Sequence, residues 1–200
     1  KQILLNNLYG VDIDTQAVEV TKLSLLLKCM EGETGSSIAA EMRFGERLLP
    51  TLDSNIKCGN SLVDLDFYDG QLDFEPAAEK KIKPFSWQKA FPTVFKQGGF
   101  DAVIGNPPYV RQELLSDYKN YFQKTYSVYH GMADLYSYFF LYGIGLLNEK
   151  GLLGIIVANK WMRANYGEPL RKWMKEQPIK QIIDFGDLPV FQGATTYPCI

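Results

Sequence analysis

The chain has 200 residues, of which 46% are hydrophobic and 22% are charged, and its formal net charge at pH 7 is −2. This composition is ordinary for a globular domain with a substantial core, and it excludes a chain that is disordered throughout. The charge excludes a globally basic nucleic-acid binder, but DNA stays open as a substrate because basic recognition surfaces often belong to another domain.

Cysteine and histidine usage argues against a metal centre and against disulfide bonds. Cys29, Cys58 and Cys199 are far apart in the sequence, and His130 is the only histidine. No cluster with the spacing of a zinc site exists, and reduced thiols in a cytosolic protein are expected. No apolar run reaches the roughly 18 residues that a membrane span needs, so no membrane partner is predicted.

Strands and helices alternate along the chain. Apolar runs with polar residues or turns at their ends predict strands at 8–13, 56–59, 100–105, 152–157, 179–185 and from 195 to 200. Helical spacing of apolar residues, with Asp14 or Thr15 as the first cap, predicts helices at 15–30, 134–147 and 168–175. Prolines and charges between 64 and 99 predict an irregular insertion. The alternation predicts an α/β fold with a mainly parallel sheet.

Polar residues follow three of the predicted strands. They are Asp12, the pair Asn60-Ser61, and the tetrapeptide Asn106-Pro107-Pro108-Tyr109. In open α/β sheets, ligands bind at the carboxyl ends of the strands. These three clusters therefore form the predicted functional site.

The tetrapeptide offers hydrogen-bond acceptors with few competing donors. Pro107 and Pro108 lack backbone N–H groups, so their polar backbone groups are carbonyls, and Asn106 adds an amide oxygen. Two such acceptors can hold both hydrogens of an exocyclic NH₂ group and stabilise the positive charge that develops during methyl transfer. Tyr109 would stack on the face of a base that carries this amino group. Because a base inside a duplex cannot reach such a pocket, the base must flip out. The alternative is a rigid proline turn with Tyr109 in the core.

The run from Phe100 to Tyr109 resembles the catalytic motif of amino-group methyltransferases. From Leu8 to Ile200 the chain is similar to the gamma class of adenine-N6 DNA methyltransferases, especially the methylase part of type IIG restriction-modification enzymes. This resemblance implies a Rossmann-like sheet, S-adenosylmethionine as cofactor, double-stranded DNA as partner, and a bacterial or archaeal cytoplasm. It implies that Asn106 and the Pro107 carbonyl bind the target amino group, that Tyr109 stacks on the adenine ring, and that Pro108 lies beside the base.

The same resemblance assigns cofactor roles at the two earlier strand ends. Asp12 is expected to bind the ribose hydroxyls, since a carboxylate accepts two hydrogen bonds from a diol, and Ile13 is expected to pack on the cofactor's adenine. Asn60, with Ser61, matches the position that binds the adenine amine. A solvated acid at position 12 and a simple turn residue at position 60 are the alternatives.

The last third of the chain adds one substrate residue to the prediction. Phe191 matches a late family motif whose aromatic residue contacts the flipped adenine, with core packing as the alternative. The aromatic residues of 134–140 are expected to lie in the core, and His130 is expected to be a surface or packed residue without a catalytic role.

The family's glycine-containing first motif has no counterpart before Asp12. We therefore expect a single partial catalytic domain over 1–200, lacking its first strand, its C-terminal end and the specificity and nuclease domains. The isolated fragment is expected to bind S-adenosylmethionine poorly and to be inactive. Rival functions are methylation of RNA or of protein glutamine, and a noncatalytic scaffold that engages DNA. The DNA target sequence and the oligomeric state are not predicted.

Overall fold

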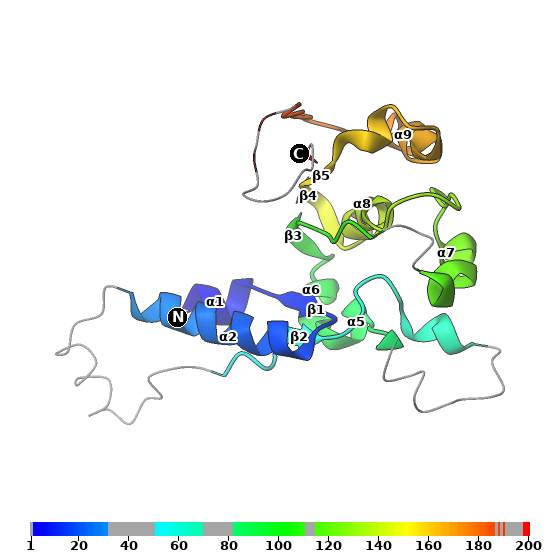
Figure 1. The fold of residues 1–200 in the computed structure, drawn as a ribbon. Coiled ribbons are helices and arrows are strands. Elements are labelled where there is room, and N and C mark those ends of the chain that lie inside the picture. The colour runs from blue at the N-terminus through cyan, green and yellow to red at the C-terminus, as the bar shows by residue number, and fades with distance from the viewer. Residues whose placement is uncertain are drawn as a thin grey trace, which may run out of the picture. The chain divides into compact units, whose positions relative to one another are not determined.

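The computed structural model describes residues 2–31, 51–69, 82–110, 115–186, 188, 190 and 198–200 (Figure 1). The chain divides into two compact units, Lys1–Phe91 and Pro92–Ile200. We call them the first and the second unit.

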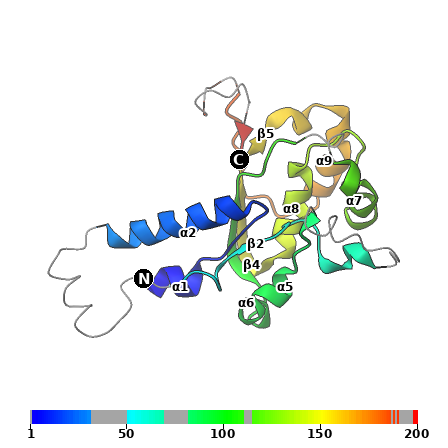
Figure 2. The ribbon, with the colours of Figure 1, turned by 60° about the horizontal axis from the view of Figure 1, so that its bottom comes forward.

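The first unit is built around two short parallel strands. Its described elements are α1 (Gln2–Asn7), β1 (Gly10–Asp12), α2 (Thr15–Met30), β2 (Ile56–Cys58), the 3₁₀ helix η1 (Leu65–Tyr68) and α5 (Trp87–Ala90). The register pairs Gly10 with Ile56 and Asp12 with Cys58. Helix α2 packs against both strands (Figure 2). One buried hydrophobic cluster of the unit consists of Leu4, Val18, Leu52 and Ile56, with Leu25, Leu26 and Cys29 packed against it.

Local sequence explains how α2 begins and how β1 is joined to β2. The Asp14 side chain accepts a hydrogen bond from the backbone N–H of Gln16 at 2.8 Å, which satisfies a donor at the first turn of α2. Asn55 is buried, and its amide donates to the carbonyls of Leu5 at 2.8 Å and Leu8 at 2.9 Å. Because Asn55 immediately precedes β2, these bonds hold the end of α1 and the approach to β1 against that strand.

The second unit contains a longer parallel pair and a short antiparallel pair. Its described elements are α6 (Pro92–Lys96), β3 (Phe100–Gly105), η3 (Ser116–Tyr118), α7 (Lys119–Thr125), α8 (Tyr136–Gly145), β4 (Leu147–Ile155), β5 (Val157–Ala158), η4 (Asn159–Met162), η5 (Asn165–Gly167), α9 (Glu168–Met174) and β6 (Pro198–Cys199). Strands β3 and β4 are parallel, and β5 and β6 are antiparallel.

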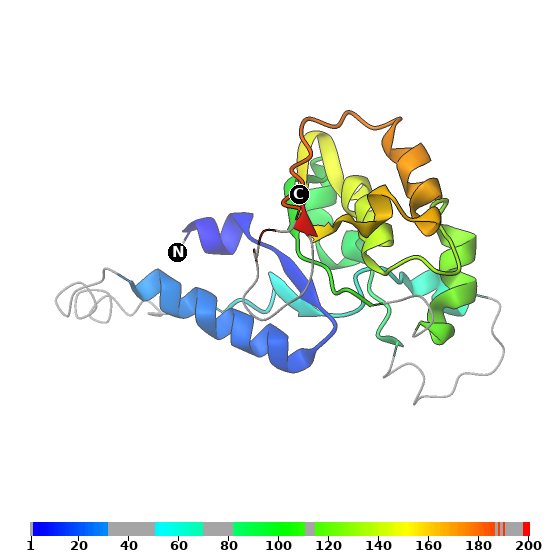
Figure 3. The ribbon, with the colours of Figure 1, turned by 45° about the horizontal axis from the view of Figure 1, so that its top comes forward.

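Helix α8 packs against β4 on one side of the β3–β4 pair (Figure 3). A Cβ atom added to Gly143 of α8 would lie 2.9 Å from the Leu153 side chain, so glycine allows this close approach. Ala102 pairs with Leu152 and Val103 with Leu153, so successive residues alternate between the two sides of the pair. Ile104 and Leu152, on the side opposite Leu153, are 88% and 50% exposed.

Most predicted elements are present, several of them with shorter or shifted bounds. Strands β1, β2 and β3 and helices α2, α8 and α9 lie within their expected ranges, whereas β4 begins at Leu147, earlier than expected, and α1 was not expected. The strand predicted at 179–185 is wrong: only Asp184 forms a bridge, with Cys199. Ile183 exchanges two backbone hydrogen bonds with Ile200, but Ile179 and Ile182 are exposed and no strand develops.

The fold class is mixed α/β. Among the described residues the strands form three separate two-stranded pairs, and no continuous Rossmann-like sheet is seen there. The predicted insertion at 64–99 contains η1, α5 and α6, while residues 70–81 lie outside the described part. No helix in the described ranges is long and apolar enough to cross a membrane.

Candidate active site

The first unit brings two of the predicted polar clusters to one edge. Because β1 and β2 are parallel neighbours, Asp12 at the end of β1 and Asn60 just after β2 lie at the carboxyl ends of adjacent strands. The backbone N–H of Gly59 donates to the carbonyl of Asp12 at 2.9 Å. This is the placement that the sequence predicted for these two residues.

Asp12 retains hydrogen-bonding capacity. Its Oδ1 accepts from the backbone N–H of Asp14 at 2.8 Å, and within the described part of the chain Oδ2 has no hydrogen-bond partner. The side chain is exposed, and the Ile13 side chain beside it is 44% exposed. An exposed carboxylate next to an exposed apolar side chain suits a ligand that carries both a diol and an aromatic ring.

Asn60 takes part in a local turn. Its Oδ1 accepts from the backbone N–H of Leu62 at 3.1 Å, which is the turn role given above as the alternative. A carbonyl oxygen has two lone pairs, so Oδ1 can still accept a second hydrogen bond from a ligand amine. Asn60 and Ser61 are both half-buried.

The second unit presents the tetrapeptide directly after β3. The backbone N–H of Ile156 donates to the carbonyl of Gly105 at 3.0 Å, so strand-like pairing continues to the residue before Asn106. Asn106 is exposed, and among the described residues its side-chain amide has no hydrogen-bond partner. Pro107 is buried and Pro108 is exposed. The residue before Asn106 is therefore held by strand pairing, and the side-chain amide of Asn106 is open to a ligand.

Tyr109 is a partly exposed ring supported from inside the unit. It is 38% exposed, and its ring lies edge-to-face with Tyr136, with centroids 6.1 Å apart and planes at 69°. Partial burial, with a smaller contribution from Cys199, raises the pKa of Tyr109 above its ordinary value. Its hydroxyl is therefore neutral at physiological pH, and part of the ring is accessible.

Tyr136 is itself fixed by a small polar network. Its hydroxyl lies 3.4 Å from that of Tyr166, which donates to Oδ2 of Asp134 at 3.3 Å. Burial raises the pKa of Tyr136, so its hydroxyl stays protonated. The backbone N–H of Leu135 also donates to the carbonyl of Val110 at 2.8 Å, joining the segment after Tyr109 to the start of α8.

Sequence reasoning found the core role of these aromatic residues but not their support of Tyr109. The expected burial is confirmed for Tyr136, Tyr138 and Phe140. The contact between Tyr136 and Tyr109 joins residues far apart in the chain, and a periodicity of apolar residues carries no signal for it.

Three further expectations concern residues away from these clusters. Phe191 lies outside the described residues. His130 is half-buried, and its Nδ1 accepts from the backbone N–H of Met132 at 3.1 Å. All three cysteines are free, and in the described ranges no group of three His, Cys, Asp or Glu side chains is placed to hold a metal ion.

Comparison with known proteins gives relatives of one class. The chain is 32% identical to the type II restriction enzyme and methyltransferase RM.Eco57I of Escherichia coli, over 100% of the chain and 19% of that protein. It is 39% identical to the type II methyltransferase M.BstVI of Geobacillus stearothermophilus, over 57% of the chain and 20% of that protein. It is 39% identical to the type II methyltransferase M.PaeR7I of Pseudomonas aeruginosa, over 52% of the chain and 19% of that protein.

These relatives are methyltransferases of the type II class, one of them combined with a restriction enzyme. Residues 6–191 match the Eco57I restriction-modification methylase family, and the chain belongs to that family. The resemblance to restriction-modification methylases inferred from the sequence is thereby confirmed. The matched part of the chain spans about a fifth of the length of each of these relatives.

Proposed function

We propose that the protein containing this chain transfers a methyl group from S-adenosylmethionine to the N6 amino group of an adenine in double-stranded DNA. Membership of a restriction-modification methylase family supports methylation of DNA. The choice of an amino group rests on Asn106 and Pro107, which supply acceptors and follow a strand end. The proposal includes a Rossmann-like arrangement of the strands and a cytoplasmic location, where the DNA is.

The proposed roles at the target amine follow from hydrogen-bonding chemistry. The Asn106 amide oxygen and the Pro107 carbonyl accept the two hydrogens of the adenine NH₂ group, which draws its nitrogen toward tetrahedral geometry and stabilises the developing positive charge. Tyr109 stacks on the ring, a contact worth about 1–3 kcal/mol. The adenine must be flipped out of the duplex, and Pro108 and Phe191 are proposed to border it.

The residues at the edge of the first unit fit the adenosine part of S-adenosylmethionine. The exposed position of Asp12 and its Oδ2, which has no partner in the described part of the chain, suit the ribose diol. The exposed side chain of Ile13 suits the face of the adenine. Asn60, with Ser61 beside it, is proposed to accept a hydrogen bond from the adenine amine. When bound, the cofactor supplies a methyl group activated by a sulfonium.

One observation carries the proposal: the exposed side-chain amide of Asn106, unpartnered among the described residues, directly before Pro107. Replacing Asn106 by Ala in the full-length protein should lower the transfer of labelled methyl groups to DNA by about 100-fold or more, because one acceptor for the developing charge is lost. Binding of DNA should persist. Asn120→Ala, on the exposed surface of α7, is the matched control and should keep full activity.

The product decides between this proposal and its rivals. Labelled N6-methyladenine in the DNA digest is the expected product. Label that appears only in RNA or in protein glutamine would contradict the choice of substrate. Unchanged methylation by the Asn106→Ala protein would contradict the role of Asn106.

A further inference from the structure

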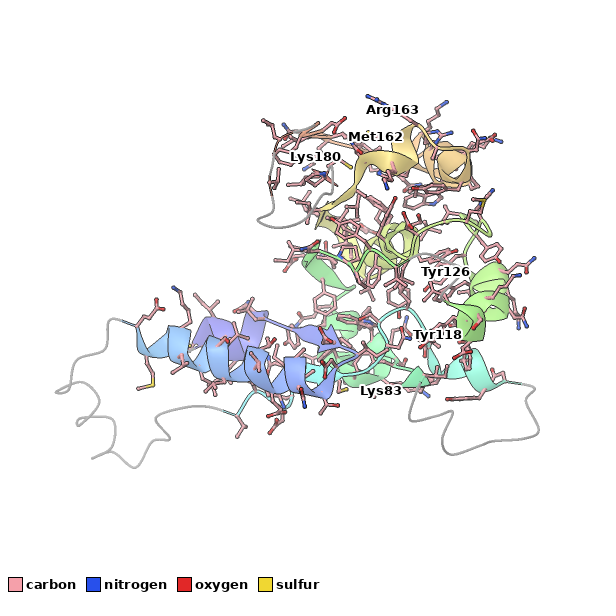
Figure 4. All side chains as sticks on the ribbon, in the orientation of Figure 1. Lys83, Tyr118, Tyr126, Met162, Arg163 and Lys180 are labelled. Atoms are coloured by element: carbon pink, nitrogen blue, oxygen red, sulfur yellow. The ribbon has the colours of Figure 1, made fainter. Side chains whose placement is uncertain are left out.

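The side chain of Lys83 reaches the loop that carries Asp12 and Ile13. Its Nζ donates to the backbone carbonyl of Ile13 at 2.8 Å and to Oγ1 of Thr15 at 3.4 Å. The Cys58 sulfur lies 3.7 Å from the same nitrogen. Figure 4 shows Lys83 beside the N-terminal end of α2, where this loop ends. The charged ammonium of Lys83 therefore fixes the carbonyl of Ile13, the residue that follows Asp12, the proposed ribose ligand.

The backbone of Lys83 reaches the other loop of the same edge. Its carbonyl accepts from the backbone N–H of Asn60 at 2.7 Å, and Asn60 forms a parallel bridge with Pro84. The N–H of Phe85 then donates to the carbonyl of Val63 at 2.7 Å. Segment 82–85 therefore runs along 60–63, and one residue contacts both strand-end loops.

The conformation of Lys83 shows that its surroundings determine it. Its φ is +50°, and no other non-glycine residue in the described ranges has a positive φ. This region is unfavourable for a residue with a side chain, and it persists only where neighbouring contacts hold it. Close packing adds to these contacts: a Cβ atom added to Gly59 would lie 2.6 Å from the Phe85 side chain.

We propose that Lys83 is a positioning residue for the cofactor, holding Ile13 and Asn60 in the arrangement that receives the adenosine moiety of S-adenosylmethionine. The inference rests on the proposed function and deepens it. The ammonium acts through the peptide of Ile13, and the backbone carbonyl acts through the amide of Asn60. Lys83 itself needs no contact with the cofactor.

The test uses four variants of the full-length protein. Lys83→Met removes the ammonium and keeps the length of the side chain. Lys83→Gly also removes it but relieves the unfavourable φ, and Lys83→Arg keeps a charged donor. Lys89→Met is the matched control, because Lys89 is an exposed lysine of α5 and the substitution changes the charge equally.

Affinity for S-adenosylmethionine is measured by calorimetry without DNA, alongside the melting temperature and steady-state kinetics. We expect Lys83→Met and Lys83→Gly to weaken binding about tenfold, since a hydrogen bond from a charged donor is lost. The KM for S-adenosylmethionine should rise while kcat at saturation stays near that of the wild type. Lys83→Arg should retain most of the affinity, Lys89→Met all of it, and Lys83→Gly should melt no lower than Lys83→Met.

Wild-type affinity in Lys83→Met and Lys83→Gly would overturn the inference and leave the proposed function standing. Weak binding by Lys83→Met with full affinity in Lys83→Gly would also overturn it, because the loss would then follow fold stability. No binding of S-adenosylmethionine by the wild type would contradict the proposed function instead. The two failures are thereby distinguished.

Discussion

At the scale of single residues, the proposed base platform depends on a ring that is completely buried. Tyr136 contacts Tyr109 edge-to-face, and its hydroxyl is linked through Tyr166 to Asp134. Tyr138, in the same helix, is equally buried but packs against Phe122 and Tyr126 instead. A comparison of variants at Tyr136 and Tyr138 therefore distinguishes the support of Tyr109 from the general packing of α8.

Replacing Tyr136 or Tyr138 by Leu should lower the free energy of unfolding by a similar amount, about 2–3 kcal/mol, because each loses a buried ring. Only Tyr136→Leu should also raise the KM for DNA, by about tenfold, since Tyr109 loses its support and part of its stacking energy. Urea denaturation and methylation kinetics measure the two effects. Equal values of KM in the two variants would contradict the role of Tyr136.

At the scale of elements, apolar patterning was sufficient where a strand or helix packs on something close by. Strand β1, helix α2 and strand β2 form one packed group, and the capping role of Asp14 was readable from its position before the apolar repeat. The segment 179–185 has a similar apolar pattern, but among the described residues it has no continuous partner strand. Because β propensity expresses packing against neighbours, the pattern alone overestimated this strand.

Asp184 holds this C-terminal segment by polar contacts. Its Oδ1 accepts from the Asn159 amide at 2.9 Å and from the backbone N–H of Gly186 at 3.0 Å. The hydrogen bond from Asn159 holds the pKa of Asp184 below its ordinary value, and the bond from Gly186 adds a smaller contribution in the same direction. A lowered pKa in the folded state means that the stabilisation is complete above the ordinary carboxyl pKa and is lost as the pH falls through the folded value.

The expected result is a lower melting temperature for Asp184→Ala than for the wild type between about pH 5 and 7. This difference should shrink once the pH falls below about 3.9, the ordinary pKa of an Asp side chain. Calorimetric scans of both proteins across this range measure it. A difference that grows toward low pH would have the wrong sign.

At the scale of the whole molecule, the described residues of the second unit leave one side of β3–β4 uncovered. Ile104 and Leu152 are exposed on it, opposite the side that receives α8. Exposed apolar strands of this kind promote self-association. The 200-residue chain produced alone should therefore self-associate.

Light scattering at neutral pH tests this expectation. Combined replacement of Ile104 and Leu152 by Thr, which retains β propensity, should reduce the scattering of the isolated chain. Val103→Thr, on the side that faces α8, serves as the control and should lower stability without reducing scattering. Equal scattering by all three proteins would show that this surface does not drive association.

Much of the candidate site was also predictable at this scale, because strand ends gather polar residues in α/β folds. The strand-end positions of Asp12, Asn60 and Asn106 were predicted in this way. Lys83 was not, because its contact with Ile13 spans 70 positions and starts in a segment without apolar periodicity. A backbone carbonyl as partner leaves no trace in residue types, so sequence patterns could not indicate it.

Buried Asn55 has a comparable consequence for how this protein can change over evolution. Its amide hydrogens are received by the main chain at Leu5 and Leu8, not by the side chains there. Homologues should therefore vary freely at these two exposed positions, while position 55 stays restricted to a residue with the same two donors. A position that contributes its side chain to a hydrogen bond is thus restricted, whereas a position that contributes only its backbone carbonyl tolerates substitution.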